Sequence, residues 1–170
     1  MVMKKKVEVF IVSFLLLTLI FTFSSVNQAK AASYNMRDLS TFPTVGYGYK
    51  TGGGFVDAMQ TILWSSGYSS AVGTIDGSFG ANTANGIKSF QSKYGLVSDG
   101  IAGVATWRKM ESFTYNVDTW SRKYSNPGSS VYMTEFKMYS TGAGAGYYSA
   151  LINKTNNKNI IKINRDMWRD

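Results

Sequence analysis

Among the side chains of this sequence, the carboxylates are the candidates for catalytic chemistry. The 170 residues include no histidine and no cysteine, which excludes thiol nucleophiles, Ser–His triads and zinc sites built on His or Cys. Two carboxylates could in principle cleave a glycosidic bond. The acidic residues of the last third are Glu111, Asp118, Glu135, Asp166 and Asp170. They match no catalytic motif, so we predict no catalytic residue, no bound metal and no cofactor.

A frame of turn residues occurs twice in the middle of the chain. The stretches "DGSFGANT" (76–83) and "DGIAGVAT" (99–106) keep Asp, Gly, Gly and Thr at the same offsets. An Asp-Gly pair favours a tight turn, because the carboxylate accepts hydrogen bonds from nearby backbone N–H groups and glycine adopts positive φ without a Cβ clash. The threonine then lies in the first helical turn, where its hydroxyl can satisfy a free N–H group. Each copy therefore predicts a turn followed by a helix.

Three short helices are expected around this repeat. Apolar residues at helical spacing predict the first helix over about residues 56–66, followed by a glycine. The second helix follows the first frame and ends before Gly95, and the third is centred on Trp107. Three such helices within residues 54–110 can share one small core. Residues 32–53 show no sustained period and indicate a linker.

Residues 111–170 have a different character and predict a β-rich region. β-branched and aromatic residues over 129–141 are typical of a strand. The glycine-rich stretch "TGAGAGYY" (141–148) reads as a connection, and residues 150–164 predict two strands around an Asn- and Lys-rich turn. The predicted fold class is therefore α+β, a small three-helix bundle followed by a small β-rich C-terminal region.

The first 31 residues have the features of a secretory signal peptide. Three lysines precede an apolar run over residues 9–23, and Ala29-Lys30-Ala31 provides a small-residue cleavage site. The run is shorter than the roughly 20 residues that span a bilayer, although an uncleaved anchor is the alternative. Removing these residues leaves 14 basic and 9 acidic side chains, a net charge of +5. We expect a secreted or cell-wall-associated protein. Its positive charge favours binding to anionic wall polymers or membrane surfaces over nucleic acid. The alternative is that the charge only keeps the protein soluble.

The positions that frame the repeat form a longer pattern. In chain order they are Gln60, Gly67-Tyr68, Asp76-Gly77, Phe79-Gly80, Thr83, Phe90-Gln91, Gly95-Leu96, Asp99-Gly100, Gly103 and Thr106-Trp107. In this pattern residues 54–110 closely resemble the peptidoglycan-binding domain of bacterial cell-wall hydrolases, a three-helix module. Met59 stands where that family usually has leucine, Ala81 and Val104 where it often has proline, and the loop 69–75 is slightly long. The resemblance implies binding of peptidoglycan.

Most of the matched positions are explained by structure, because their apolar residues suit a core and their glycines suit turns. The polar and aromatic positions near the loops are the candidates for ligand contact: Tyr68, Asp76, Asn82, Gln91, Asp99 and Trp107. An aromatic ring can stack on the apolar face of a sugar, and amides and carboxylates can fix its hydroxyls or the peptide stem. Trp107 fits equally well as a core residue that closes the bundle.

Three functions are compatible with these observations. The favoured one is a secreted, non-catalytic protein that binds peptidoglycan. The second is an exported toxin or inhibitor that delivers residues 111–170 to a wall or membrane, because this region carries Lys154, Lys158, Lys162, Arg165, Trp168 and Arg169, which suit an anionic surface. The third is a minimal wall hydrolase that uses two carboxylates, and changing Glu111 or Glu135 to glutamine would then abolish its activity.

Overall fold

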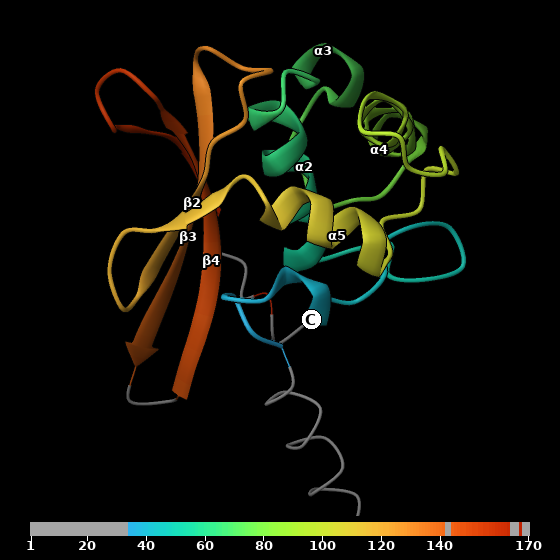
Figure 1. Ribbon diagram of the computed structural model, residues 1–170. Coiled ribbons are helices and arrows are strands. Elements are labelled where there is room, and N and C mark those ends of the chain that lie inside the picture. The colour runs from blue at the N-terminus through green and yellow to red at the C-terminus, as the bar shows by residue number, and fades with distance from the viewer. Residues whose placement is uncertain (1–33, 142–143, 164–166, 168–170) are drawn as a thin grey trace, which may run out of the picture. The chain divides into compact units, whose positions relative to one another are not determined.

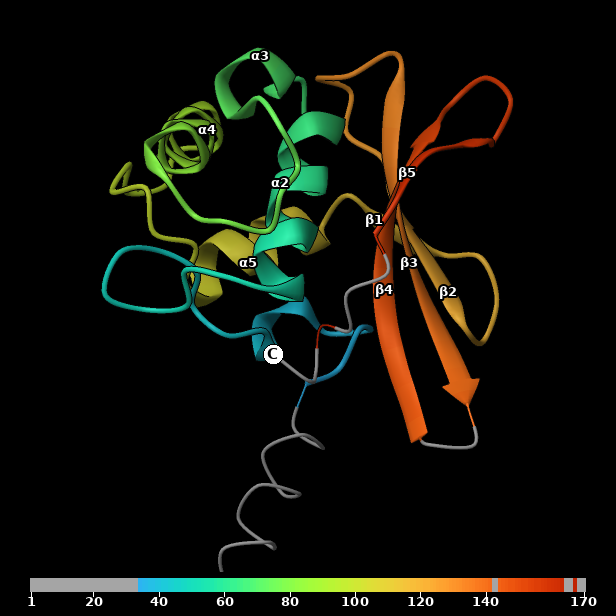
Figure 2. The same cartoon turned by 180° about the vertical axis from the view of Figure 1, so that it is seen from behind.

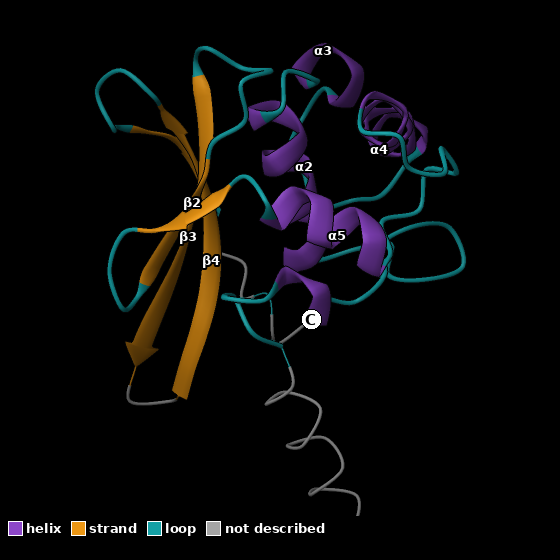
Figure 3. Cartoon of the chain, viewed as in Figure 1, coloured by secondary structure: helices purple, strands orange, loops and turns teal. Residues whose placement is uncertain are grey.

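The computed structural model of the protein describes residues 34–141, 144–163 and 167. The predicted signal peptide lies outside these residues, as do Asp166 and Asp170 among the candidate carboxylates and Arg165, Trp168 and Arg169 of the basic tail. The described part divides into helices followed by strands, which confirms the α+β prediction (Figure 3).

The predicted helices are present and two short ones are added. In chain order they are η1 (Leu39–Thr41, a 3₁₀-helix), α2 (Gly54–Ser65), α3 (Ser69–Val72), α4 (Ala81–Lys93) and α5 (Val104–Glu111). Helix α3 occupies the loop that is long for the family. Figures 1 and 2 show α2 between α4 and the sheet.

Helices α2 and α4 end in the same way, as their sequences predict. Gly67 and Gly95 follow their last turns with φ of 90° and 69°. The residue after each glycine donates its N–H to a carbonyl of the last turn, at 3.0 and 2.9 Å. This is the Schellman arrangement, which glycine favours because the left-handed conformation carries no Cβ clash.

The C-terminal region is one antiparallel sheet in the order β1-β2-β3-β4-β5. Its strands are β1 (Thr114–Asn116), β2 (Ser121–Tyr124), β3 (Tyr132–Thr141), β4 (Gly144–Asn153) and β5 (Asn159–Lys162). The strand predicted over 129–141 and the two strands around the Asn- and Lys-rich turn are confirmed. The predicted connection at 141–148 is wrong in large part, since Gly144 to Tyr148 pair with β3. A strand with two glycines is possible at this place because the backbone groups, which glycine also has, make the ladder.

The helices and the sheet share one apolar core, and residues 34–170 form one compact unit. Helix α2 packs against β3 and β4 (Figures 1 and 2). Fully buried members of the core come from the N-terminal segment, three helices and the sheet: Leu39, Ile62, Phe90, Trp107 and Phe136. The boundary between a helical domain and a β-rich region at residue 110 stays a prediction.

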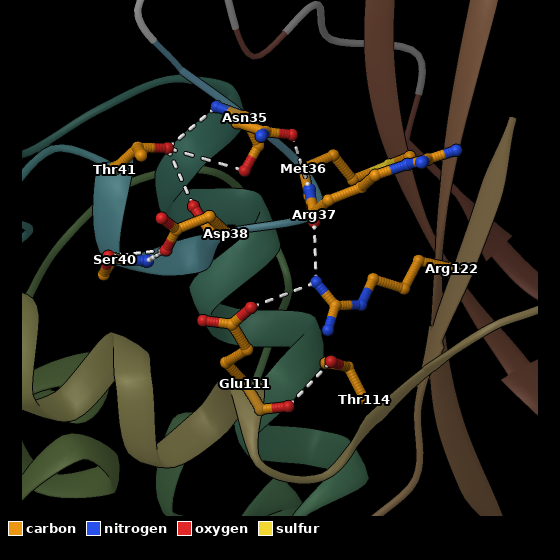
Figure 4. A network of polar contacts seen from close by, with 9 residues as sticks. All are labelled: Asn35, Met36, Arg37, Asp38, Ser40, Thr41, Glu111, Thr114 and Arg122. Atoms are coloured by element: carbon orange, nitrogen blue, oxygen red, sulfur yellow. Dashed lines mark hydrogen bonds and ion pairs between the residues drawn. The ribbon is translucent and has the colours of Figure 1, made fainter. Parts of the chain in front are cut away.

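The segment expected to be a linker packs into this core. Met36, Leu39, Phe42 and Val45 are all buried. Figure 4 shows how polar contacts fix the segment: Asp38 caps η1 by accepting a hydrogen bond from the Ser40 N–H at 3.0 Å. A guanidinium from the sheet also reaches the segment, because Arg122 donates to the Met36 carbonyl at 3.2 Å.

Candidate functional site

A buried glutamine of α2 holds the first Asp-Gly turn in place. Gln60 is 1 % exposed, and its Nε2 donates to Asp76 Oδ1 at 2.9 Å and to Thr83 Oγ1 at 3.2 Å. A third acceptor is the carbonyl of Ser78 at 3.1 Å. Its Oε1 accepts from the backbone N–H groups of Asp76 and Gly77, at 3.0 and 2.9 Å. Both ends of one amide therefore tie the turn to the start of α4.

A second glutamine repeats this arrangement one unit later. Gln91 of α4 is 2 % exposed, and its Nε2 donates to Asp99 Oδ1 at 2.9 Å and to Thr106 Oγ1 at 3.1 Å. It also donates to the Ile101 carbonyl at 2.9 Å, and its Oε1 accepts from the Gly100 N–H at 2.9 Å. We call these two arrangements the glutamine clamps of Gln60 and Gln91. They are the structural meaning of the repeated frame.

The clamps correct the role that the sequence predicts for the two threonines. Thr83 and Thr106 are buried in α4 and α5, and their hydroxyl oxygens accept hydrogen bonds from the amides of Gln60 and Gln91. The helices are instead capped at Gly80 and Gly103, neither of which offers a side chain. The difference arises because the partners are long-range glutamines, which local turn chemistry does not reveal.

Each clamp lies beside an open hollow at the start of the following helix. The first hollow has a volume of about 430 Å³ and is lined by Gln60 and by residues between 72 and 83. The second has a volume of about 500 Å³ and is lined by Gln91, residues between 95 and 106, and two residues of the N-terminal segment. The repeated frame thus produces two hollows of the same construction.

The structure places four of the six candidate residues at these hollows. Asp76 and Asn82 line the first hollow, and Gln91 and Asp99 line the second. Asp76, Asn82 and Asp99 are exposed. One carboxylate oxygen of each aspartate also closes its own turn, by accepting the N–H two residues further on at 2.9 and 2.8 Å. The buried amide of Gln91 serves the clamp.

The two remaining candidates lie outside the hollows. Trp107 is 0 % exposed, its Nε1 donates to the Pro43 carbonyl at 3.0 Å, and its ring contacts Phe42 edge-on at 5.2 Å. Of the two roles that the sequence left open for Trp107, this geometry is that of a core residue. Tyr68 follows α2 and donates its hydroxyl to the Ser89 carbonyl at 3.4 Å. Partial burial raises the pKa of the Tyr68 phenol.

Two exposed tyrosines beside the hollows were missed by the sequence analysis. Tyr47 and Tyr49 are 60 % and 59 % exposed. They belong to the short loop Gly46–Lys50, which the sequence analysis assigned to a linker. The available signal was the alternation "GYGY", since glycines on both sides of an aromatic residue favour a tight, exposed turn.

Glu111 and Glu135, two of the candidate carboxylates, do not form a pair with each other. Glu111 receives a hydrogen bond from Arg122 at 3.2 Å (Figure 4), and Glu135 lies 3.9 Å from Lys123. Arg122 and Lys123 are neighbours in β2, so their side chains point to opposite faces of the sheet. The two glutamates therefore cannot flank one glycosidic bond. Asp118 accepts the Trp120 N–H at 2.7 Å, a bond that lowers the pKa of this carboxyl.

Lys154 and Lys158, two of the basic side chains expected to contact an anionic surface, differ in their exposure to solvent. Lys154 donates to the carbonyls of Asn126 and Ser129, and burial lowers its pKa. Lys158 is exposed.

Over residues 34–141, 144–163 and 167, no helix has the length and apolar character needed to cross a membrane. The same residues contain no group of three or more acidic side chains placed to hold a metal ion.

Comparison with known proteins bears directly on the helical part. A search of curated proteins gives no match. Among solved structures, the chain is similar to "The crystal structure of SleB N-terminal domain", with 35% sequence identity over 36% of this chain and 81% of that chain, and a TM-score of 0.32. Residues 52–110 match the family described as "Putative peptidoglycan binding domain". These residues, with their two glutamine clamps, thus belong to the peptidoglycan-binding domain family.

Proposed function

We propose that this is a secreted, non-catalytic bacterial protein that attaches to cell-wall peptidoglycan through its helical module. The observation that carries the proposal is the family membership of residues 52–110. Export is supported by the lysines, apolar run and small-residue site of residues 1–31. An exported chain without cysteine reaches the wall without needing disulfide formation.

The arrangement of the carboxylates supports a binding role. A glycosidase needs two carboxyl groups on either side of one scissile bond. Glu111 of α5 pairs with Arg122, whereas Glu135 of β3 lies near Lys123, whose side chain is on the other face of the sheet. The hydrolase alternative therefore does not find a catalytic pair in these two glutamates.

The two hollows supply the polar groups for the proposed contact. Asp76 and Asn82 at the first hollow, and Asp99 at the second, offer hydrogen-bonding groups to sugar hydroxyls, N-acetyl groups or stem-peptide amides. Gln91 positions the Asp99 turn through its hydrogen bonds to Asp99 and Gly100. A small open site gives modest affinity for one ligand unit, which the repeating wall polymer offsets because a released protein rebinds nearby.

Co-sedimentation with purified peptidoglycan tests this function. The chain without residues 1–31 is mixed with peptidoglycan stripped of teichoic acids, at low and at moderate salt. Binding at both salts supports recognition by the hollows, whereas loss of binding at moderate salt indicates electrostatic attraction alone. Replacing Asn82 by alanine should weaken binding, while Asn85→Ala, an exposed control on the same helix, should not. Absence of binding by the unchanged chain contradicts the proposal.

A further inference from the structure

The loop Gly46–Lys50 presents two aromatic rings to solvent outside the matched family domain. Tyr47 and Tyr49 are more than half exposed, and residues 46–50 precede the family match at 52–110. Large exposed aromatic side chains gathered in one place are a common feature of binding surfaces. Packing in the core therefore does not explain why this loop carries two exposed tyrosines.

The loop is held in a fixed shape by its own backbone. Tyr49 donates its N–H to the Gly46 carbonyl at 3.0 Å, and Gly46 donates to the Lys50 carbonyl at 3.2 Å. Gly48, at φ 83°, adopts a left-handed conformation at the tip. Because the loop is ordered before any ligand arrives, contact with its rings costs little conformational entropy.

The segment that carries the loop is also tied to both Asp-Gly turns. On one side, Val45 and Ala102 exchange two backbone hydrogen bonds of 3.2 and 2.8 Å. On the other side, Phe79 donates to the Thr51 carbonyl at 2.8 Å. Figures 1 and 2 show this loop (cyan) on the side of the helices that faces away from the sheet.

Each tyrosine is associated with a different hollow. The ring of Tyr47 contacts Phe79 edge-on, with ring centres 5.0 Å apart, and Phe79 lines the first hollow. Tyr49 lines the second hollow. One short, rigid loop thus places an aromatic ring beside each of two polar hollows.

The charge of the hollows indicates which component of the wall they suit. Each lining includes one aspartate, and neither includes a lysine or arginine among the described residues. The carboxylates of a stem peptide and the phosphates of a teichoic acid would meet repulsion from these aspartates. A neutral sugar chain suits the site better, because its C–H faces stack on tyrosine rings and its hydroxyls and amides hydrogen-bond to the hollows.

We infer that Tyr47 and Tyr49 form an aromatic platform that binds the glycan strand of peptidoglycan. This inference rests on the proposed function and specifies its ligand. The platform acts together with the hollows: the rings hold the sugar faces, and the polar groups of the hollows hold their substituents.

The test compares tyrosine variants of the chain without residues 1–31. The variants are Tyr47→Ala, Tyr49→Ala and their double, with Tyr→Phe at both positions to keep the rings. Tyr115→Ala, which removes an exposed tyrosine from the sheet, is the matched control. Circular dichroism and thermal unfolding show that each variant is folded. The probes are intact peptidoglycan, glycan strands freed from stem peptides by an amidase, and the freed peptides.

The expected result is binding of the unchanged chain to intact peptidoglycan and to the freed glycan. The double alanine variant should lose about tenfold or more in affinity for both, while the phenylalanine variants and Tyr115→Ala keep it. Equal binding by the folded alanine variants, or binding to the freed peptides instead of glycan, overturns the inference and leaves the proposed function intact. Failure of the unchanged chain to bind intact peptidoglycan overturns both.

Discussion

At the scale of single residues, two buried glutamines explain most of the repeated frame. The amides of Gln60 and Gln91 each hold an aspartate, a backbone turn and a threonine hydroxyl. Buried polar groups are favourable only when they are hydrogen-bonded, and an unsatisfied one costs more than the bond contributes. The need to satisfy each buried glutamine amide therefore accounts for the aspartate and the threonine of each frame. The same hydrogen bonds hold the aspartates at the hollows.

Replacing Gln91 by leucine should destabilise the protein strongly. The substitution keeps the side-chain volume roughly constant but leaves Thr106 and the Gly100 N–H without their buried partner. We expect the free energy of unfolding to fall by about 2–4 kcal/mol, measured by urea denaturation. Ser92→Ala, at the next and exposed position, should change it by less than about 0.5 kcal/mol. Equal stability of the two variants contradicts the role of the clamp.

A buried phenol predicts how stability changes in alkali. Tyr124 shares hydrogen bonds with Ser66 (2.6 Å) and Asn126 (3.1 Å), and burial raises the pKa of its hydroxyl well above the ordinary value. Above about pH 10 the unfolded chain ionises this tyrosine while the folded chain keeps it protonated. The free energy of unfolding should therefore fall as the pH rises above about 10.

Urea denaturation between about pH 8 and pH 11 measures this slope. Tyr124→Phe should be less stable at neutral pH, because Ser66 and Asn126 lose a partner, but its stability should fall less steeply in alkali. The slope should not vanish, since burial also raises the pKa of Tyr68 and Tyr147. An unchanged slope in the variant contradicts the account.

At the scale of elements, the sequence predicted those helices and strands whose form is decided by neighbouring residues in the chain. Helices α2 and α4 were predicted because an apolar period is followed by glycines that favour Schellman ends. Strands β1 and β2 were missed because they have three and four residues and no clear alternation. The tyrosine loop was missed because its position depends on backbone bonds to Ala102 and Phe79, which are distant in sequence. Tertiary partners, rather than propensity, decide these cases.

Gly67, after the end of α2, and Gly128, in the connection between β2 and β3, pack closely against each other. A Cβ added at Gly128 would lie 2.2 Å from the Ser66 carbonyl oxygen, so Gly128→Ala should push the β2–β3 connection away from the end of α2. We expect a loss of about 1–3 kcal/mol in the free energy of unfolding. Gly52→Ala is the matched control, because a Cβ there would lie no closer than 3.8 Å to its nearest neighbour, an ordinary van der Waals distance. A Gly128→Ala protein as stable as this control contradicts the close packing.

At the scale of the whole molecule, the sheet depends on the helices for one of its faces. Ser65 and Thr134 share a buried hydrogen bond of 2.8 Å, and Phe136 is buried in the common core. The N-terminal segment joins the same core through Leu39 and Phe42. The C-terminal region thus completes the core on which the helices pack.

Residues 111–170 alone should therefore not fold. Without α2, the inner face of β3 and β4 would expose apolar residues to water, at a cost of about 25 cal/mol per Å². We expect the isolated segment to show poorly dispersed amide signals in NMR spectra or to aggregate, while residues 34–170 give a dispersed spectrum. A folded, monomeric 111–170 segment contradicts the shared core and would reopen the possibility that it acts independently on a membrane.

The most direct test of wall binding by the helical module is an NMR titration with soluble peptidoglycan fragments. The ¹⁵N-labelled chain without residues 1–31 is titrated with fragments released by a muramidase, and the amide shifts are mapped on the structure. The account predicts changes in the two Asp-Gly turns and the loop Gly46–Lys50, with the sheet unaffected. Changes confined to the sheet, or none at saturating fragment, would contradict it.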